Sequence, residues 1–145
     1  MSYQWRKKSE ERHVGMRIGL LEDNPAIVDM LVTALTLKGH VVESYTTGFS
    51  LLELLLPANS HATPRLYDVL IIDLCLPGDL SGWDVLARLE EVLSLEYCSV
   101  IVVSGASAGE LERLHRRFPT VTVMHKPIHL AELLQIIANS TSSSQ

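Results

Sequence analysis

Three acidic residues, a serine and a lysine stand where this 145-residue sequence could place chemistry. Asp73 directly follows the uninterrupted apolar run of residues 69–72, and a Pro-Gly turn comes shortly after it. Such a run predicts a strand that is buried on both faces, with Asp73 at its carboxyl end. Because ligands gather at the carboxyl ends of strands in open parallel sheets, we take Asp73 as the candidate reactive residue.

Four other polar residues follow further predicted strands: Glu22, Asp23, Ser104 and Lys126. Three carboxylates held close together repel one another unless a cation lies between them, and ligation by oxygen alone favours Mg²⁺. A carboxylate can also attack phosphorus and form an aspartyl phosphate. A metal ion, an ammonium group and a hydroxyl would then stabilise the transferring phosphoryl oxygens. The group therefore predicts phosphoryl transfer onto Asp73.

The elements that must position these side chains alternate along the chain. Apolar segments favour strands at residues 16–21, 41–45, 67–74, 100–103 and 121–124. Each is followed by helically spaced apolar residues, and Asn24, Ser81 and Ser107 carry helix-capping signals. Five such alternations predict a doubly wound α/β fold, in which helices cover both faces of a five-stranded parallel sheet. Right-handed crossovers and short loops favour the strand order 2-1-3-4-5, which makes the four strands that precede the polar residues neighbours.

The composition excludes several other classes of protein. The chain is 47% hydrophobic with a net charge of -5, which is typical of one domain with its own core. No apolar stretch approaches the roughly 20 residues that span a bilayer. The first residues lack the apolar core of a signal peptide, so we expect a cytoplasmic protein. Its two cysteines, Cys75 and Cys98, are too few for a disulfide scaffold.

The charge is unevenly distributed along the chain. The first 14 residues hold four basic and two acidic side chains, so the remainder carries a net charge of -7. A negative body argues against direct binding of nucleic acid. We expect residues 1–15 to form a flexible basic leader, residues 16–139 to form the single domain, and residues 140–145 to form a disordered serine-rich tail.

These motifs resemble those of the receiver domains of two-component response regulators, over nearly the whole chain. The resemblance rests on the segments Leu21–Asn24, Ile72–Gly78, Ser81–Gly82, Val102–Gly105 and Lys126–Pro127. It implies the flavodoxin-like fold of that family, and a stand-alone receiver that resembles the chemotaxis regulators.

The resemblance also implies a role for each polar residue. Asp73 would be the phosphoacceptor, and Asp23 and Asp73 would ligate Mg²⁺ directly. Glu22 would hold the ion through water, and the backbone carbonyl of Cys75 would be a further ligand. The phosphoryl group would be contacted by Ser104 and Lys126, and the bond between Lys126 and Pro127 is often cis in this family.

The same resemblance implies partners. A sensor histidine kinase or a phosphotransfer protein would supply the phosphoryl group, and the receiver would catalyse its own phosphorylation and dephosphorylation. An unknown downstream protein, or a second copy of the chain, would bind the face made by the helix after Ser107, the strand at 121–124 and the last helix. We expect no contact with nucleic acid or membrane.

Two alternatives and one departure from the family stay open. A pseudo-receiver would act as a binding module without phosphorylation, but such proteins usually lose an acidic residue or the lysine. A hydrolase of the haloacid dehalogenase type would need a second acid where Cys75 stands. The position that usually carries an aromatic switch residue holds Val123. Either the output uses another route or another face, or Val123 simply packs the strand.

Overall fold

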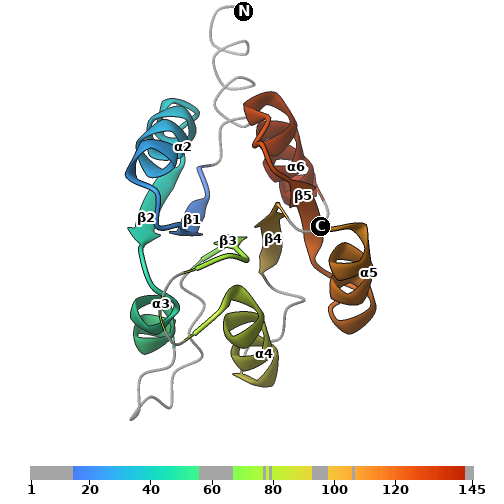
Figure 1. Ribbon diagram of the computed structural model, residues 1–145. Coiled ribbons are helices and arrows are strands. Elements are labelled where there is room, and N and C mark those ends of the chain that lie inside the picture. Colours follow the sequence, from blue (N-terminus) through green and yellow to red (C-terminus); the bar gives the residue numbers. More distant parts are fainter. Residues whose placement is uncertain are drawn as a thin grey trace, which may run out of the picture.

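Strands and helices alternate along the chain (Figure 1). The computed structural model describes residues 15–55, 67–76, 78, 80–92, 98–105 and 107–142. The strands are β1 (Arg17–Leu21), β2 (Val41–Tyr45), β3 (Val69–Asp73), β4 (Ser99–Ser104) and β5 (Thr122–His125). The helices of the described residues are α2 (Pro25–Leu37), α3 (Gly48–Leu55), α4 (Gly82–Val92), α5 (Ala108–Arg117) and α6 (Leu130–Ser142). The α/β class predicted from the sequence is confirmed.

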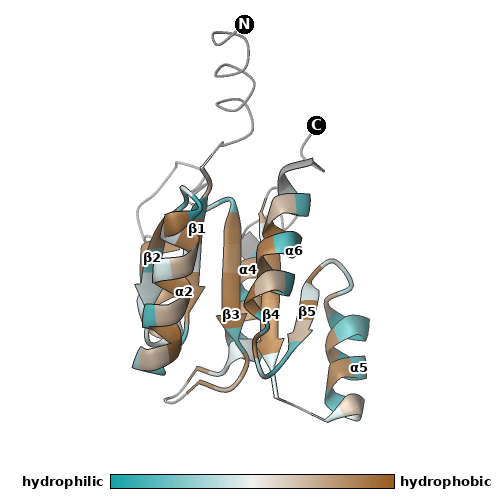
Figure 2. Ribbon diagram, turned by 90° about the horizontal axis from the view of Figure 1, so that it is seen from above, coloured by the Kyte–Doolittle hydropathy of each residue, from teal (hydrophilic) through white to brown (hydrophobic). Residues whose placement is uncertain are grey.

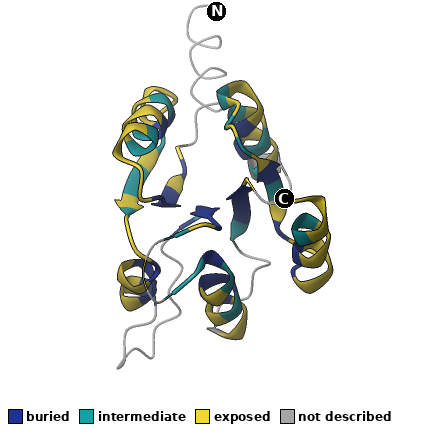
Figure 3. Cartoon of the chain, in the orientation of Figure 1, coloured by how far each residue is buried: buried dark blue, intermediate teal, exposed yellow. Residues whose placement is uncertain are grey.

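The five strands form one parallel sheet in the order β2-β1-β3-β4-β5, as predicted. Parallel neighbours require crossover connections, which explains why a helix follows each strand. The central strand, β3, has neighbours on both sides, and all five of its residues are buried (Figure 3). Its continuous apolar sequence therefore reflects burial on both faces of the sheet.

Helices pack on both faces of this sheet, and each face has its own apolar core (Figures 1 and 2). One core joins α2 and α6 to alternate strand residues such as Ile18 and Ile71. The other joins α3, α4 and α5 to the intervening residues, such as Leu70 and Ile72. Because successive side chains of a strand point to opposite faces, each of the inner strands supplies both cores.

The predicted caps start three of the helices. The side chain of Asn24 accepts hydrogen bonds from two backbone N–H groups in the first turn of α2. The hydroxyl of Ser107 accepts a bond from the backbone N–H of Glu110 at the start of α5. Ahead of α4, the backbone N–H of Ser81 donates to the carboxylate of Asp84, whose own N–H donates back to the Ser81 hydroxyl. These bonds satisfy N–H groups that a helix cannot pair internally.

The helix and strand boundaries differ from the predicted ones by a few residues. Helix α6 extends to Ser142, so residues 140–142 of the predicted tail are helical. The hydroxyl of Ser140 bonds the carbonyl of Ile136 one turn earlier, which accommodates this polar residue within the helix. The rest of the predicted tail, most of the predicted leader and the loop at 58–66 lie outside the described residues. Within the described part, no helix has the length and apolar character needed to span a bilayer.

Candidate phosphoryl-transfer site

The carboxyl edge of the sheet holds three polar side chains that are almost completely buried. Glu22 and Asp73 are each 4% exposed, and Ser104 is 2% exposed. They are the buried polar side chains of the described residues. Burying such groups costs free energy unless they are paired, so their concentration at one edge indicates a site that is kept for function.

Strand pairing brings these residues together with the lysine. Asp73 and Ser104 are the last residues of β3 and β4, whereas Glu22 and Lys126 come one residue after β1 and β5. Because these four strands are neighbours and run in parallel, their carboxyl ends meet at one edge. The backbone N–H of Lys126 bonds the carbonyl of Ser104 at 2.8 Å, which continues the pairing of β4 and β5 beyond the last strand residue.

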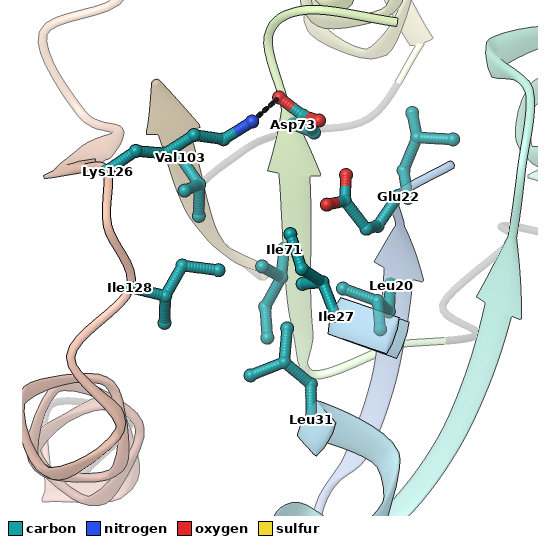
Figure 4. A pocket seen from close by; sticks show the side chains of 10 residues that line it. Leu20, Glu22, Ile27, Leu31, Ile71, Asp73, Val103, Lys126 and Ile128 are labelled. Atoms are coloured by element: carbon teal, nitrogen blue, oxygen red, sulfur yellow. Dashed lines mark ion pairs between the residues drawn. The ribbon is translucent and has the colours of Figure 1, made fainter. Parts of the chain in front are cut away.

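The three predicted acidic residues form one cluster. Glu22, Asp23 and Asp73 each offer a carboxylate oxygen, and these oxygens lie within 4.8 Å of one another. Asp23 is exposed and the other two are buried, so the cluster is open to solvent on one side. The close-up shows Glu22 and Asp73 rising toward each other from adjacent strands (Figure 4).

The charge of this cluster fits a divalent cation. Burial is the largest cause that raises the pKa of Glu22 to about 8, followed by the hydrogen bond to Asp73 and the repulsion from its carboxylate. A carboxyl that holds its proton so strongly shows that the cluster favours added positive charge. Oxygen donors of this kind, partly open to water, match the preference of Mg²⁺.

Lys126 already provides one positive charge to the cluster. Its Nζ lies 3.1 Å from Oδ1 of Asp73, an ion pair drawn in Figure 4. Burial alone would lower the pKa of Lys126, but the hydrogen bond and charge of Asp73, with the charge of Glu22, outweigh burial and raise it. The lysine therefore stays protonated and points its charge at the candidate phosphoacceptor.

A backbone donor also holds the carboxylate of Asp73 in place. The N–H of Cys75 donates to Oδ1 of Asp73 at 3.0 Å, so the chain folds back on the end of β3. The peptide N–H of Leu74 donates to the carbonyl of Val103 on β4. The thiol side chain of Cys75 is free and exposed. The metal-ligand role predicted for the Cys75 carbonyl stays a prediction.

Ser104 and Lys126 also face a second space, a cleft of about 570 Å³ beside the acidic cluster. Its walls come from the ends of β3, β4 and β5 and from the starts of α4 and α5. The residues that line it are Leu74, Cys75, Leu76, Ser81, Trp83, Ser104, Gly105, Glu110 and Lys126. The cleft could admit a phosphoryl group or part of a donor molecule next to Ser104 and Lys126.

Two residues of this cleft were not predicted from the sequence. The indole N–H of Trp83 donates to Oε1 of Glu110 at 3.3 Å and so links α4 to α5. In the sequence, Trp83 sits within a helix-capping segment and Glu110 within a capping box, and both read as local helix residues. Their spacing of 27 residues carries no signal of the contact.

Val123, at the position of the family's switch aromatic, is half-buried beside the core that α4 and α5 share.

Apolar side chains support the acidic cluster from below. Ile27 and Leu31 of α2, Ile71 of β3 and Ile128 after β5 line a narrow pocket beneath Glu22 and Asp73 (Figure 4). The carboxylates of Glu22 and Asp73 therefore pack against apolar side chains on one side and face solvent only at the edge of the sheet. This low-dielectric surrounding strengthens each electrostatic interaction within the site.

Comparison with known families now identifies the class of protein. A sequence model of the response regulator receiver domain matches residues 18–138, most of the chain. The chain belongs to that family. Receiver domains act in two-component signalling, bind Mg²⁺ at an acidic cluster and typically interact with histidine kinases or phosphotransfer proteins. The resemblance drawn from the motifs is confirmed.

Individual relatives agree with this family. The transcriptional regulatory protein TcrA of Mycobacterium tuberculosis is 34% identical over an alignment of 79 residues, which covers 52% of this chain and 26% of TcrA. The receiver thus spans about a quarter of that curated relative.

Solved receivers share the fold. A CheY-like receiver from Methanospirillum hungatei is 20% identical, with a TM-score of 0.73 over 91% of this chain and 100% of that one. TrrA of Thermotoga maritima, solved in complex with Mg²⁺-BeF, is 20% identical with a TM-score of 0.67 over 86% and 97%. The phosphorylated cyanobacterial phytochrome response regulator RcpA is 27% identical, with a TM-score of 0.66 over 87% and 91%.

Proposed function

We propose that this receiver accepts a phosphoryl group on Asp73 in a Mg²⁺-dependent reaction and thereby switches its protein contacts. One observation carries the proposal. Asp73 is buried at the end of the central strand, where it pairs with Lys126 at 3.1 Å and shares a cluster with two further carboxylates. This arrangement has a nucleophile, a cation partner and a set of metal ligands in one place.

The transfer can be written with residues of this chain. A carboxylate oxygen of Asp73 attacks phosphorus of a phosphohistidine on a partner protein, a P–O bond forms, and the P–N bond breaks. The imidazole leaves with the electrons of that bond and takes up a proton from solvent. Lys126 stabilises the negative oxygens of the transferring group, and the Ser104 hydroxyl donates a hydrogen bond to the aspartyl phosphate.

The acidic cluster would hold the metal. Asp23 and Asp73 would ligate Mg²⁺ directly, Glu22 would hold it through water, and the carbonyl of Cys75 would complete the protein ligands. The bound ion would neutralise negative charge on the phosphoryl oxygens during transfer. Without it, the repulsion between the incoming phosphoryl group and the cluster would oppose the reaction.

The partners follow from the same reading. The donor would be a sensor histidine kinase or a phosphotransfer protein, and the hydrolysis of the aspartyl phosphate would reset the receiver. The output would be a change in the face made by α5, β5 and α6, where a downstream protein or a second copy of the chain would bind. Phosphate would act by shifting an existing equilibrium between two conformations of this face.

The direct test is phosphorylation by a small donor. Acetyl phosphate is added with and without Mg²⁺, and phosphoryl incorporation is followed by intact mass spectrometry. We expect incorporation of one phosphoryl group that requires Mg²⁺ and is absent in Asp73→Asn. The Asp73→Asn variant keeps nearly the same side-chain volume, so a circular dichroism spectrum equal to wild type shows that it folds.

The result also separates the two functional readings. Folded protein that binds Mg²⁺ but takes up no phosphoryl group would contradict the proposal. That outcome would favour the phosphorylation-independent pseudo-receiver, in which the acidic cluster serves another purpose. Incorporation that persists in Asp73→Asn would instead move the reaction to a different residue.

A further inference from the structure

One contact at the mouth of the cleft has no part in the transfer itself. The indole N–H of Trp83, in the first turn of α4, donates to the Glu110 carboxylate, in the first turn of α5, at 3.3 Å. Both residues line the cleft that Ser104 and Lys126 also line. Among the described residues that line this cleft, Trp83 is the aromatic one and Glu110 is the acidic one.

The rest of the boundary between α4 and α5 is also held together. The Trp83 ring lies 6.1 Å from the ring of Phe118, which is buried at the end of α5. Arg117 lies over the Phe118 ring, with its Cζ 4.6 Å from the ring centroid, and pairs with Glu90 of α4 at 2.7 Å. The Trp83–Glu110 bond adds a link between the first turns of the two helices, beside the cleft that Ser104 and Lys126 also line.

A phosphoryl group on Asp73 would change the charge in this cleft. It would replace the single negative charge of the Asp73 carboxylate by about two, carried on oxygens next to Ser104 and Lys126 in the space that the Glu110 carboxylate also borders. Like charges confined in a partly buried cleft repel one another strongly. The phosphoryl group would thus push Glu110 away from the cleft and weaken its bond to Trp83.

We propose that Trp83 and Glu110 are positioning residues that form a latch between α4 and α5, and that a phosphoryl group on Asp73 opens this latch. The latch gives this chain an aromatic link to the output face although Val123 stands at the usual aromatic position. Its opening frees the start of α5, which belongs to the proposed output face. The inference rests on the proposed phosphorylation of Asp73.

Thermodynamic reciprocity supplies a test with a definite sign. If the phosphoryl group opens the latch, then removing the latch must favour binding of the phosphoryl group. Trp83→Phe removes the N–H donor but keeps an aromatic ring against Phe118 and leaves the Glu110 charge unchanged. A purely electrostatic effect of Glu110 would be the same in this variant, and a merely structural contact would weaken binding when removed.

The affinity of the phosphoryl analogue is measured by titration calorimetry with beryllium fluoride in the presence of Mg²⁺. We expect Trp83→Phe and Glu110→Ala to bind the analogue at least about 5-fold more tightly than wild type, the lower end of typical coupling between sites. Glu112→Ala removes an exposed carboxylate of the same helix and should bind like wild type. Affinity in Trp83→Phe that equals or falls below wild type would overturn the latch, as would an equal gain in Glu112→Ala.

Fluorescence gives the second measurement. The chain has two tryptophans, so Trp5→Phe leaves Trp83 as the single tryptophan, whose emission is followed by selective excitation. We expect quenching of Trp83 by acrylamide to increase when Mg²⁺ and beryllium fluoride are added, and to stay constant in the same background with Asp73→Asn. Constant quenching in the parent, or an equal increase in the Asp73→Asn variant, would overturn the latch.

Intact mass spectrometry on the same samples with acetyl phosphate separates this inference from the proposed function. Phosphoryl incorporation without a change in Trp83 quenching would overturn the latch and leave the phosphoreceiver standing. A complete lack of incorporation would overturn both.

Discussion

Lys126 borders both spaces at the carboxyl edge of the sheet. Its ammonium pairs with Asp73 on the side of the acidic cluster, and its side chain also lines the cleft beside Ser104. At 31% exposure, this side chain can follow a group that arrives from solvent. The raised pKa keeps its charge in place across the physiological range of pH.

We predict that Lys126→Ala slows phosphorylation of Asp73 by about 100-fold, because a preorganised charge on the transferring oxygens typically contributes a factor of this order. Initial rates with acetyl phosphate at saturating Mg²⁺, followed by intact mass, provide the measurement. Lys38→Ala removes an exposed lysine at the end of α2 and serves as the control. Rates for Lys126→Ala that match the control would show that this ammonium takes no part in the transfer.

At the scale of an element, the start of α4 is fitted closely to the end of β3. A Cβ atom added to Gly82 would lie 2.6 Å from Cα of Leu74 and 2.9 Å from the carbonyl oxygen of Asp73. These are backbone atoms and cannot rotate away. The N–H of Gly82 also donates to the carbonyl of Leu74, so the helix begins directly against the chain that carries the proposed phosphoacceptor.

We therefore predict that Gly82→Ala destabilises the receiver by about 1–3 kcal/mol, the usual range for an overpacked site, and slows phosphorylation by displacing Asp73. Gly109→Ala is a matched control, because nothing lies within 4 Å of an added Cβ at this helical position. The free energy of unfolding of Gly109→Ala should be about 0.4–1 kcal/mol higher than that of wild type. Urea unfolding measures both changes, and a stable Gly82→Ala would mean that this close packing is dispensable.

The sequence predicts local features better than contacts between distant elements. The apolar run before Asp73 and the helix cap at Ser107 depend on neighbouring residues, and both are confirmed by the structure. The reciprocal bond of the predicted capping box is not among the hydrogen bonds of the described residues, because the Glu110 carboxylate accepts from Trp83 instead. The Trp83–Glu110 bond depends on how far apart α4 and α5 pack, which no single segment encodes. The sequence nevertheless predicts that the acidic cluster and Lys126 lie together. All of them follow strands of one parallel sheet, and the strand order alone determines which carboxyl ends are neighbours.

Across the whole molecule, stability depends on contacts far from the site. His40 connects the start of β1 to the turn before β2, because its Nδ1 accepts a hydrogen bond from the backbone N–H of Met16 at 3.1 Å. Burial lowers the pKa of His40 below its ordinary value of 6.5. Protonation of Nδ1 would also remove the acceptor of this bond.

The sign of the pH effect follows from this lowered pKa. Below about pH 6.5 the unfolded chain protonates His40 while the folded protein still keeps it neutral. The contribution of His40 to stability is thus complete above pH 6.5 and declines as the pH falls toward the lower pKa of the folded state. We predict that His40→Asn, which can accept the Met16 bond without titrating, loses less stability than wild type between pH 7.5 and pH 5.5. Urea unfolding at both pH values measures this loss, and an equal loss of unfolding free energy in the two proteins would contradict the prediction.

The two spaces at the carboxyl edge lie against different helical layers. The pocket beneath Glu22 and Asp73 is lined by α2 and the segment before α6, whereas the cleft is lined by α4 and α5. Among the residues that line them, Lys126 is common to both. Substitutions on α4 and α5 that touch neither Gly82 nor the lining of the cleft can therefore alter the response without changing the residues proposed to carry out the transfer. In evolutionary terms, related receivers can acquire new downstream partner proteins and still inherit the same residues for phosphoryl transfer.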